Sequence, residues 1–175
     1  IGGRGVLLAS TLLIETAIRS GQHALASDEY GMSQRGGSVV SLIKIGSFKS
    51  PLIGRENADT LLAFEESEFY RNLTFLKRNG HAIINTRRDA LPDSILEVLK
   101  ERNIKYQLIN ADGIAMDKNM IQASNMAVLG CFSRLSAGPY TFKNIRDTIK
   151  ERTKGKFVEQ NLDVFDTGYN YATVK

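Results

Sequence analysis

Segments with helical periodicity alternate along this chain with short runs rich in apolar and β-branched residues. The periodicity predicts helices over residues 6–20, 65–79, 92–102, 119–135, 141–151 and 158–172. The short runs predict strands over residues 23–27, 38–45, 60–64, 81–85 and 105–110. Strands that alternate with helices are typical of an α/β fold, so we expect a three-layer αβα, Rossmann-like domain with a mainly parallel sheet.

Two local patterns refine this expectation. The first helix is apolar over a broad face, which should be largely buried. Its apolar residues are Val6, Leu7, Leu12, Leu13, Ala17 and Ile18. A glycine followed by His-Ala occurs at Gly21–Ala24 and again at Gly80–Ala82, where we expect it to end a helix and begin a strand of a βαβ unit.

The domain organisation is predicted to be simple. No linker rich in Gly, Pro or Ser divides the chain, so residues 1–175 are expected to form a single domain. The chain begins with a glycine cluster where a Rossmann-like unit has its first strand. We therefore expect that strand to lie upstream of Ile1 and to be truncated here.

Composition narrows the possible functions. The chain has one cysteine and two histidines, too few for an internal disulfide, a self-held iron–sulfur cluster or a usual zinc site. No apolar run could span a bilayer and no signal peptide is visible, which predicts a cytoplasmic protein without a membrane partner. The net charge is +4, but acidic and basic residues are interleaved, so no nucleic-acid partner is expected. The basic stretch 141–156 is either a solvated helix face or an anion or partner contact.

The first candidate site is the turn Gly2-Gly3-Arg4-Gly5, which leads into a helix. Glycines let backbone N–H groups approach a phosphate, and a helix N-terminus favours an anion. Asp28 or Glu29 would then occupy the place of a ribose ligand. A G-x-G-x-x-G count from Gly3 puts Leu8 at the third glycine, which argues against full dinucleotide recognition. A tight structural turn and a bound anion or cofactor phosphate remain as alternatives.

The second candidate site is a polar, glycine-rich loop between two predicted strands. It consists of Tyr30, Gly31, Met32, Ser33, Gln34, Arg35, Gly36 and Gly37, followed by Ser38. Arg35 could bind a carboxylate or phosphate through two hydrogen bonds, and Gly36-Gly37 would allow close backbone approach. The loop could equally be a simple connection with an exposed arginine.

Other polar residues are weaker candidates, and no catalytic or metal-binding residue is predicted. His23 and His81 are interpreted as hydrogen-bonded structural groups, and Cys131 as a packed helix residue. The segment Arg87–Asp89 is either a solvated loop or a second crevice contact. Asn125, in an apolar helix, is expected to satisfy the backbone of a neighbouring loop rather than to bind a ligand.

Five blocks of the sequence resemble one family in order. They are GGRGVLLAS at residues 2–10, the run from Ala26 to Gly46, ADTLLAFE at 58–65, NGHAIINT at 79–86 and ASNMAVLG at 123–130. Together they resemble the gamma subunit or domain of 2-oxoacid:ferredoxin oxidoreductases. The string Gly-Met-Ser-Gln-Arg-Gly-Gly is most similar to the beta subunit of indolepyruvate:ferredoxin oxidoreductase. Arg4 departs from the family, which commonly has glutamine there; it could pair with a carboxylate or a cofactor phosphate.

The resemblance implies a subunit that is inactive alone. In such enzymes a 2-oxoacid is decarboxylated on thiamine diphosphate, electrons pass through iron–sulfur clusters to ferredoxin, and coenzyme A accepts the acyl group. These cofactors would be held in the complex by larger partner subunits and none by this chain alone. The turn Gly2–Gly5 and the loop Tyr30–Gly37 would face those subunits as cofactor-binding segments. The alternatives are a stand-alone nucleotide- or anion-binding Rossmann-like module and an assembly protein without a ligand.

Overall fold

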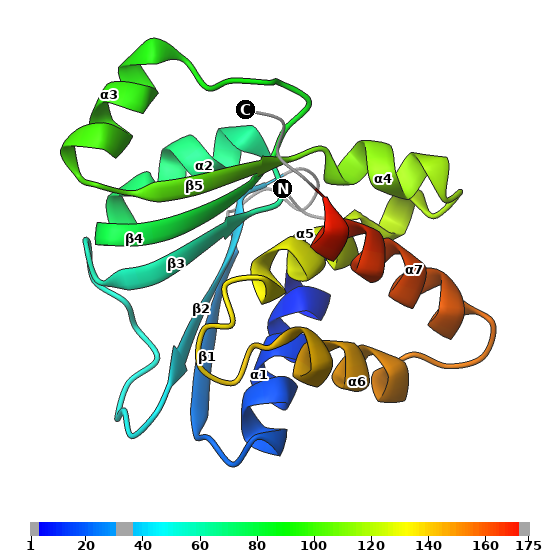
Figure 1. The fold of residues 1–175 in the computed structure, drawn as a ribbon. Coiled ribbons are helices and arrows are strands. Elements are labelled where there is room, and N and C mark those ends of the chain that lie inside the picture. Colours follow the sequence, from blue (N-terminus) through cyan, green and yellow to red (C-terminus); the bar gives the residue numbers. More distant parts are fainter. Residues whose placement is uncertain (1–3, 31–36, 172–175) are drawn as a thin grey trace.

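The computed structural model describes residues 4–30 and 37–171, and Figure 1 shows their arrangement. The strands are β1 (Ala24–Tyr30), β2 (Val39–Ile45), β3 (Ala58–Ala63), β4 (Leu76–Asn85) and β5 (Lys105–Ile109). The α-helices are α1 (Val6–Arg19), α2 (Glu66–Asn72), α3 (Asp93–Glu101), α4 (Ala111–Asp117), α5 (Ser124–Ser133), α6 (Phe142–Arg152) and α7 (Phe157–Asn170). Two 3₁₀ turns, η1 (Leu73–Phe75) and η2 (Ile121–Ala123), complete the described elements.

The parallel sheet β3-β4-β5 lies between two layers of helices, which confirms the α/β prediction. Side chains alternate between the faces of a strand, and the carboxyl-terminal parts of β4 and β5 are apolar on both faces. Ile83 and Ile109 belong to a core formed with α1, α4, α5, α6 and α7. Ala82, Ile84 and Leu108 belong to a second core formed with α2 and α3. Burial on both faces is the reason why Ala82-Ile83-Ile84 and Leu108-Ile109 are short continuous apolar runs.

The strands β1 and β2 form an antiparallel pair outside the parallel sheet, with Ala24 opposite Ile45 and Tyr30 opposite Val39. The expectation that His23-Ala24 begins a strand of a βαβ unit is therefore wrong. Only residues 31–38 connect β1 to β2, whereas a parallel crossover needs about a dozen residues or more. The same interval is ample for a hairpin.

The predicted helix 65–79 is also shorter in the structure, because α2 ends at Asn72 and β4 begins at Leu76. Gly80 therefore lies inside a strand and does not end a helix. A Cβ atom at Gly80 would lie 2.8 Å from Cδ1 of Leu76 and 2.9 Å from the carbonyl oxygen of Lys77. The strand pairing shifts at the same place, between Ala58 and Thr60 of β3. Gly80 thus permits a close backbone bend at an irregularity of the sheet.

The central helix of the larger core is α5, whose residues are all buried. It packs closely on α7 through two glycines. A Cβ atom at Gly130 would lie 2.0 Å from the carbonyl oxygen of Phe165, and one at Gly168 would lie 2.2 Å from that of Ala127. The predicted helix 119–135 is divided here between η2 and α5, and α4 was not predicted at all.

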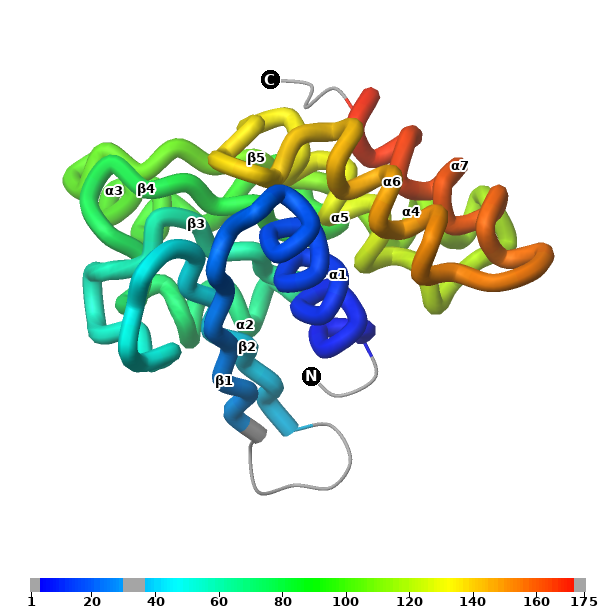
Figure 2. Tube along the Cα trace, turned by 90° about the horizontal axis from the view of Figure 1, so that it is seen from below, coloured from blue at the N-terminus to red at the C-terminus, as the bar shows by residue number. Residues whose placement is uncertain are grey.

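The first helix, α1, is buried on one side only. Ala9, Leu12 and Ala17 are at most 2% exposed, whereas Leu7 and Ile18 are 40% and 58% exposed. Of the face predicted to be largely buried, Leu12, Leu13 and Ala17 are buried, but Leu7 and Ile18 are exposed. Figure 2 shows α1 at the surface, with the β1–β2 hairpin on one side and α6 on the other. Every helix in the described ranges is too short or too polar to cross a bilayer.

Candidate functional site at the carboxyl edge of the sheet

The candidate site lies where the three parallel strands end. β3 leads into Glu65, β4 into Thr86 and β5 into Asn110, so their following residues meet at one edge. We call this edge, with the residues that immediately follow the strands, the carboxyl edge. Ligands of open α/β sheets bind in the crevice outside this edge.

Arg4 joins the glycine turn to the carboxyl edge. Its Nε donates to Oε1 of Glu65 at 2.6 Å, and its Nη1 donates to Oδ1 of Asp112 at 2.9 Å. The hydrogen bond to Glu65, opposed by partial burial and aided by both carboxylate charges, raises the pKa of Arg4. Of the two partners expected for Arg4, a carboxylate or a phosphate, the structure shows carboxylates.

Gly5 holds the turn in place. Its φ of 72° is in the left-handed region that favours glycine. Its carbonyl accepts hydrogen bonds from Nδ2 of Asn125 at 3.2 Å and from the backbone N–H of Ala9 at 3.0 Å. The prediction that Asn125 satisfies a neighbouring backbone is confirmed. The preceding Gly2 and Gly3 lie outside the described residues.

Asn85 ties the strand ends together from inside. Its side chain is buried, donates to the carbonyl of Phe64 at 3.0 Å and to Oδ1 of Asp112 at 3.2 Å, and accepts from the N–H of Ala111 at 2.9 Å. The Asp112 oxygen that receives Arg4 is therefore also held by Asn85. A side chain with its hydrogen bonds satisfied in this way fixes the geometry of the edge.

The second predicted loop reaches the same helix as the first. Ser38, at the end of the loop, donates to Oε2 of Glu68 at 2.6 Å, and Arg71 reaches Oε1 of the same carboxylate at 3.0 Å. Gly37 is partly buried next to Ser38. Residues Gly31–Gly36, with Met32, Ser33, Gln34 and Arg35, lie outside the described residues, as does the side chain of Tyr30.

Glu66 connects the start of α2 to the end of β4. Its carboxylate accepts from the hydroxyls of Thr86 and Tyr70, and Nε of Arg88 lies 3.4 Å from it. Burial opposes ionisation of Glu66, but these hydrogen bonds and the Arg88 charge together hold its pKa below the ordinary value. Burial and the neighbouring carboxylate raise the pKa of Tyr70 to about 12. At neutral pH the pair is therefore a carboxylate and a neutral phenol.

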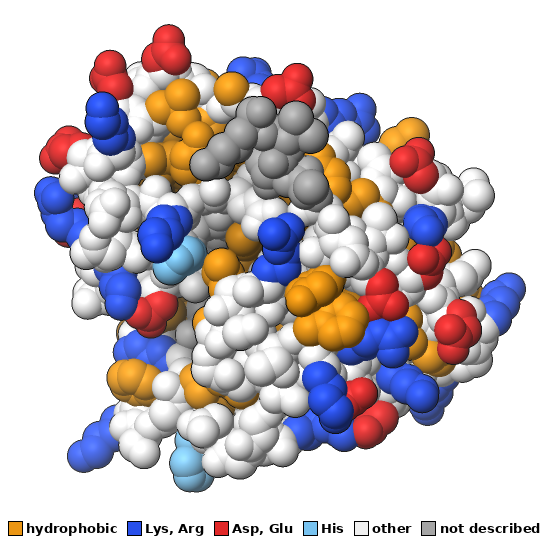
Figure 3. Space-filling view, viewed as in Figure 1, with side chains coloured by type: hydrophobic (Ala, Val, Ile, Leu, Met, Phe, Trp, Pro, Cys, Tyr) orange, Lys and Arg blue, Asp and Glu red, His pale blue; other side chains and the backbone are white. Residues whose placement is uncertain are grey.

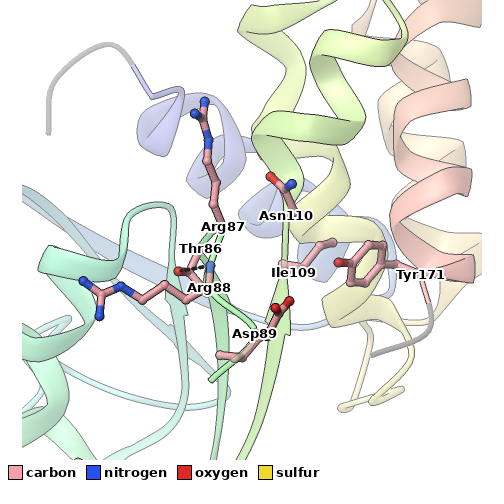
Figure 4. Close-up of a pocket in the computed structure, with 8 residues that line it drawn as sticks. Thr86, Arg87, Arg88, Asp89, Ile109, Asn110 and Tyr171 are labelled. Atoms are coloured by element: carbon pink, nitrogen blue, oxygen red, sulfur yellow. Dashed lines mark hydrogen bonds between the residues drawn. The ribbon is translucent and has the colours of Figure 1, made fainter. Parts of the chain in front are cut away.

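A small pocket of about 130 Å³ opens beside this network. It is lined by Thr86, Arg87, Arg88, Asp89, Leu108, Ile109, Asn110 and Tyr171. Figure 4 shows that Arg88, whose N–H bonds to the Thr86 hydroxyl at 3.1 Å, and Arg87 point in different directions from the loop. Arg87 is exposed and has no ion pair within residues 4–30 and 37–171, so its charge is available to an anion.

Several of these residues were not predicted. Glu65, Asn85, Thr86 and Asp112 each follow or end a parallel strand, and that position was the available signal. Asp28 is not placed to bind a ribose, as the dinucleotide interpretation required. It lies in the antiparallel hairpin and accepts a hydrogen bond from Ser41 at 2.6 Å. Leu8 is 47% exposed, so it does not pack between helix and strand.

The two histidines do not belong to the carboxyl edge. His23 precedes β1 in the hairpin, and His81 pairs with Thr60 and with Lys105, the first residue of β5, away from the carboxyl ends of the strands. Neither imidazole makes a hydrogen bond within the described part of the chain, and the interpretation as hydrogen-bonded groups stays a prediction. In Figure 3, acidic and basic side chains are interspersed over the visible face, as the sequence indicated.

The described residues do not fit an iron–sulfur cluster, which needs several thiolates. Cys131 is fully buried in α5, and burial raises its pKa to about 12. No group of three or more His, Cys, Asp or Glu side chains in the described ranges is placed to hold a metal ion.

The sequence was compared with protein families and with proteins of known function. Residues 1–171 match the family model described as pyruvate ferredoxin/flavodoxin oxidoreductase. The chain is 32% identical to the indolepyruvate oxidoreductase subunit IorB of Archaeoglobus fulgidus, covering 98% of this chain and 92% of that protein. It is 25% identical to the common subunit gamma of the pyruvate/ketoisovalerate oxidoreductases of Thermococcus kodakarensis, covering 99% and 94%.

Solved structures with a similar fold include subunits of the same kind of enzyme. The gamma subunit of keto/oxoacid ferredoxin oxidoreductase from Geobacter sulfurreducens superposes with a TM-score of 0.76 at 24% identity, covering 97% of this chain and 92% of that one. The protein is thus an α/β protein whose candidate site lies at the carboxyl edge of its parallel sheet. The chain belongs to the pyruvate ferredoxin/flavodoxin oxidoreductase family, and it is a gamma-type subunit of a 2-oxoacid:ferredoxin oxidoreductase. Complexes of this family use thiamine diphosphate, iron–sulfur clusters and coenzyme A.

Proposed function

We propose that this chain serves an indolepyruvate-type enzyme, with its carboxyl edge turned toward larger subunits that hold thiamine diphosphate and the clusters. The turn Gly2–Gly5 and the loop Tyr30–Gly37 then shape the approach of the 2-oxoacid or of coenzyme A. The choice of an aryl pyruvate is supported by the 32% identity to an indolepyruvate subunit against 25% to a pyruvate/ketoisovalerate subunit. Ferredoxin is reached through the complex, and we place the complex in the cytoplasm.

The observation that supports this proposal is that Arg4, in the first glycine-rich segment, and Ser38, at the end of the second, both bind carboxylates at the start of α2. Arg4 of the first segment binds Glu65, and Ser38 at the end of the second binds Glu68. These carboxylates lie within one helical turn of each other, next to the carboxyl edge. Arg4 and Ser38, 34 positions apart in the sequence, therefore both reach the start of α2.

The chemistry of the carboxyl edge suits an anionic ligand. A 2-oxoacid carries a carboxylate and coenzyme A carries phosphates, and both are bound well by arginine and by backbone N–H groups of glycine turns. Arg4 is already compensated by Glu65 and Asp112, so its role is to position the turn. Arg87, without an ion pair among the described residues, and Arg35 of the loop are the side chains we expect to meet the ligand.

Within the assembled enzyme this chain supplies position and electric field, while the cofactors of the other subunits supply the chemistry. Buried Asn85 and the Glu66–Thr86–Tyr70 network keep the carboxyl edge rigid. A rigid edge holds a ligand without the entropic cost of ordering the site upon binding.

The first experiment purifies the chain alone and together with co-expressed companion subunits. Alone it should be colourless and should not oxidise any 2-oxoacid with ferredoxin or a dye. The complex should turn over, and profiling should favour an aryl pyruvate over pyruvate. Turnover by the isolated chain would refute the proposal. A monomeric chain that binds nucleotide tightly and joins no thiamine-bearing subunit would favour the stand-alone module instead.

The second experiment compares Arg35→Ala with Arg55→Ala in the complex. Arg55 is exposed in the β2–β3 loop and makes no side-chain hydrogen bond or ion pair within the described residues, so it is a matched control. Loss of one charge-assisted hydrogen bond of about 1.5–3 kcal/mol should raise the KM for coenzyme A or the 2-oxoacid roughly 10- to 100-fold. The melting temperature should not change. Equal KM values in the two variants would show that the loop does not meet either ligand.

A further inference from the structure

The loop that follows β4, residues 86–89, begins at a threonine that makes three hydrogen bonds. The N–H of Thr86 donates to the carbonyl of Ile109 at 3.0 Å, and its hydroxyl donates to the carboxylate of Glu66. The same hydroxyl oxygen accepts from the backbone N–H of Arg88 at 3.1 Å. Thr86 is only 7% exposed, so these hydrogen bonds are shielded from competing water.

Glu66 determines how this hydroxyl is oriented. A threonine hydroxyl has a single proton, so once it donates to Glu66 its lone pairs are left for the N–H of Arg88. Glu66 is itself held at the start of α2, where the hydroxyl of Tyr70 donates to it and Nε of Arg88 lies 3.4 Å away. One carboxylate and one hydroxyl therefore join α2, the end of β4 and the loop.

Arg87 lies between the two residues that this network holds. The N–H of Thr86 is bound before it and the N–H of Arg88 is bound after it, so the Cα–Cβ bond of Arg87 leaves the loop in a set direction. Arg87 is exposed, and it makes no hydrogen bond or ion pair of its own within residues 4–30 and 37–171. The network thus fixes the base of an arginine that has no partner in the described part of the fold.

The direction of Arg87 matters because of the pocket of about 130 Å³ at the carboxyl edge. Figure 4 shows Arg87 and Asn110 extending to one side of the strand ends, whereas Asp89 lies on the other side. The side-chain oxygen of Asn110 accepts from the N–H of Gly113 at 2.9 Å, and its amide NH₂ makes no hydrogen bond within the described ranges. A guanidinium and an amide donor that are both available can bind a carboxylate or a phosphate.

We propose that Thr86 and Glu66 are positioning residues of the assembled enzyme: without touching the ligand, they aim Arg87 at its anionic group. The inference rests on the proposed function, in which the carboxyl edge receives a 2-oxoacid or coenzyme A. The anionic group is a carboxylate in the first case and a phosphate in the second, and a guanidinium binds the paired oxygens of either. An arginine whose base is held in advance loses less conformational freedom when the ligand binds.

Steady-state kinetics of the complex test the proposal. Thr86→Val nearly keeps the shape of the side chain and removes the hydroxyl. It should raise the KM for coenzyme A or for the 2-oxoacid about tenfold and leave kcat within about twofold, since a displaced arginine weakens binding and not the chemistry of the other subunits. Glu66→Ala should raise the same KM. Thr86→Ser, which keeps the hydroxyl, should restore the KM of the unmodified enzyme. A rise for coenzyme A alone assigns Arg87 to a phosphate, and a rise for the 2-oxoacid alone assigns it to a carboxylate.

A double-variant cycle shows whether Thr86 acts through Arg87. In the Arg87→Ala background, Thr86→Val should change neither KM further, because the side chain that it positions is gone. Thr148→Val in α6 is the control for lost stability, since Thr148 is 1% exposed and its hydroxyl donates to the carbonyl of Asn144 at 2.9 Å and accepts from Thr16 at 3.0 Å. It should lower the melting temperature, as Thr86→Val does, and leave both KM values unchanged.

Three results would overturn the positioning role. The first is that Thr86→Val or Arg87→Ala leaves both KM values unchanged. The second is that the effects of Thr86→Val and Arg87→Ala multiply in full, which would mean that Thr86 does not act through the arginine. The third is an equal rise of KM in Thr148→Val, which would trace the effect to lost stability.

The two proposals can fail separately. If the unmodified complex turns over and Thr86→Val has the same KM values, only the positioning role is wrong. If the unmodified chain forms no complex that oxidises a 2-oxoacid, the proposed function is wrong and the positioning role falls with it.

Discussion

The glycine turn makes a quantitative prediction through Gly5 and Asn125. Gly5 has a φ of 72°, and a Cβ atom there would lie 2.5 Å from Nδ2 of Asn125. Gly5→Ala therefore meets two penalties. The left-handed backbone costs an L-residue about 1–2 kcal/mol, and the overlap with a buried side chain costs about 1–3 kcal/mol. We expect Gly5→Ala to lower the free energy of unfolding by about 2–5 kcal/mol.

Asn125→Ala separates the two penalties. Alone it removes the hydrogen bond to the Gly5 carbonyl, at a cost of about 1 kcal/mol, and that carbonyl still accepts from Ala9. In the double variant the overlap is gone and only the backbone penalty of Gly5→Ala remains. The substitution should then cost about 1–2 kcal/mol, so the cycle should show a favourable coupling of about 1–3 kcal/mol.

Urea unfolding of the four proteins, followed by circular dichroism, measures these values. The slope with urea should be the same in all four, because the folded and unfolded surfaces are unchanged. If Gly5→Ala costs the same in both backgrounds within about 0.5 kcal/mol, the steric contact with Asn125 does not determine the choice of glycine.

Two further predictions concern helix packing and pH. Gly168→Ala should lower the free energy of unfolding by about 1–3 kcal/mol or more, because its methyl group would overlap the backbone of Ala127. Gly113→Ala is the control: its methyl group meets only the side chain of Asn110, so it should cost no more than about 1 kcal/mol. Equal losses of stability in thermal melts of the two variants would refute the tight α5–α7 contact. Glu66→Gln should lower the melting temperature at neutral pH, because the folded-state pKa of Glu66 is depressed below its ordinary value of 4.5. The ionised carboxylate therefore stabilises the fold fully above pH 4.5, and this stabilisation is lost as the pH falls through the lower folded-state pKa. The difference from the unmodified chain should shrink in acid, and a constant difference would argue against an ionised, hydrogen-bonded Glu66.

The sequence alone determined the fold class and the strands of the parallel sheet. Within the runs 81–85 and 105–110, Ala82-Ile83-Ile84 and Leu108-Ile109 place apolar side chains on both faces, which is typical of a strand covered by helices on both sides. The same periodicity located α1, α3, α6 and α7 closely. The blocks around Gly5 and Ser38 identified the family.

Only the tertiary structure decided how these elements meet. Periodicity cannot tell a hairpin from a βαβ unit, so β1 and β2 were assigned to the wrong kind of pairing. Arg4 finds Glu65 and Asp112 at separations of 61 and 108 residues, which no local pattern records. Likewise the sequence shows that α1 is apolar over a broad face, but only packing shows that Leu7 and Ile18 of that face are exposed. Contacts between distant residues depend on the arrangement of whole elements, and that arrangement is a property of the fold rather than of any segment.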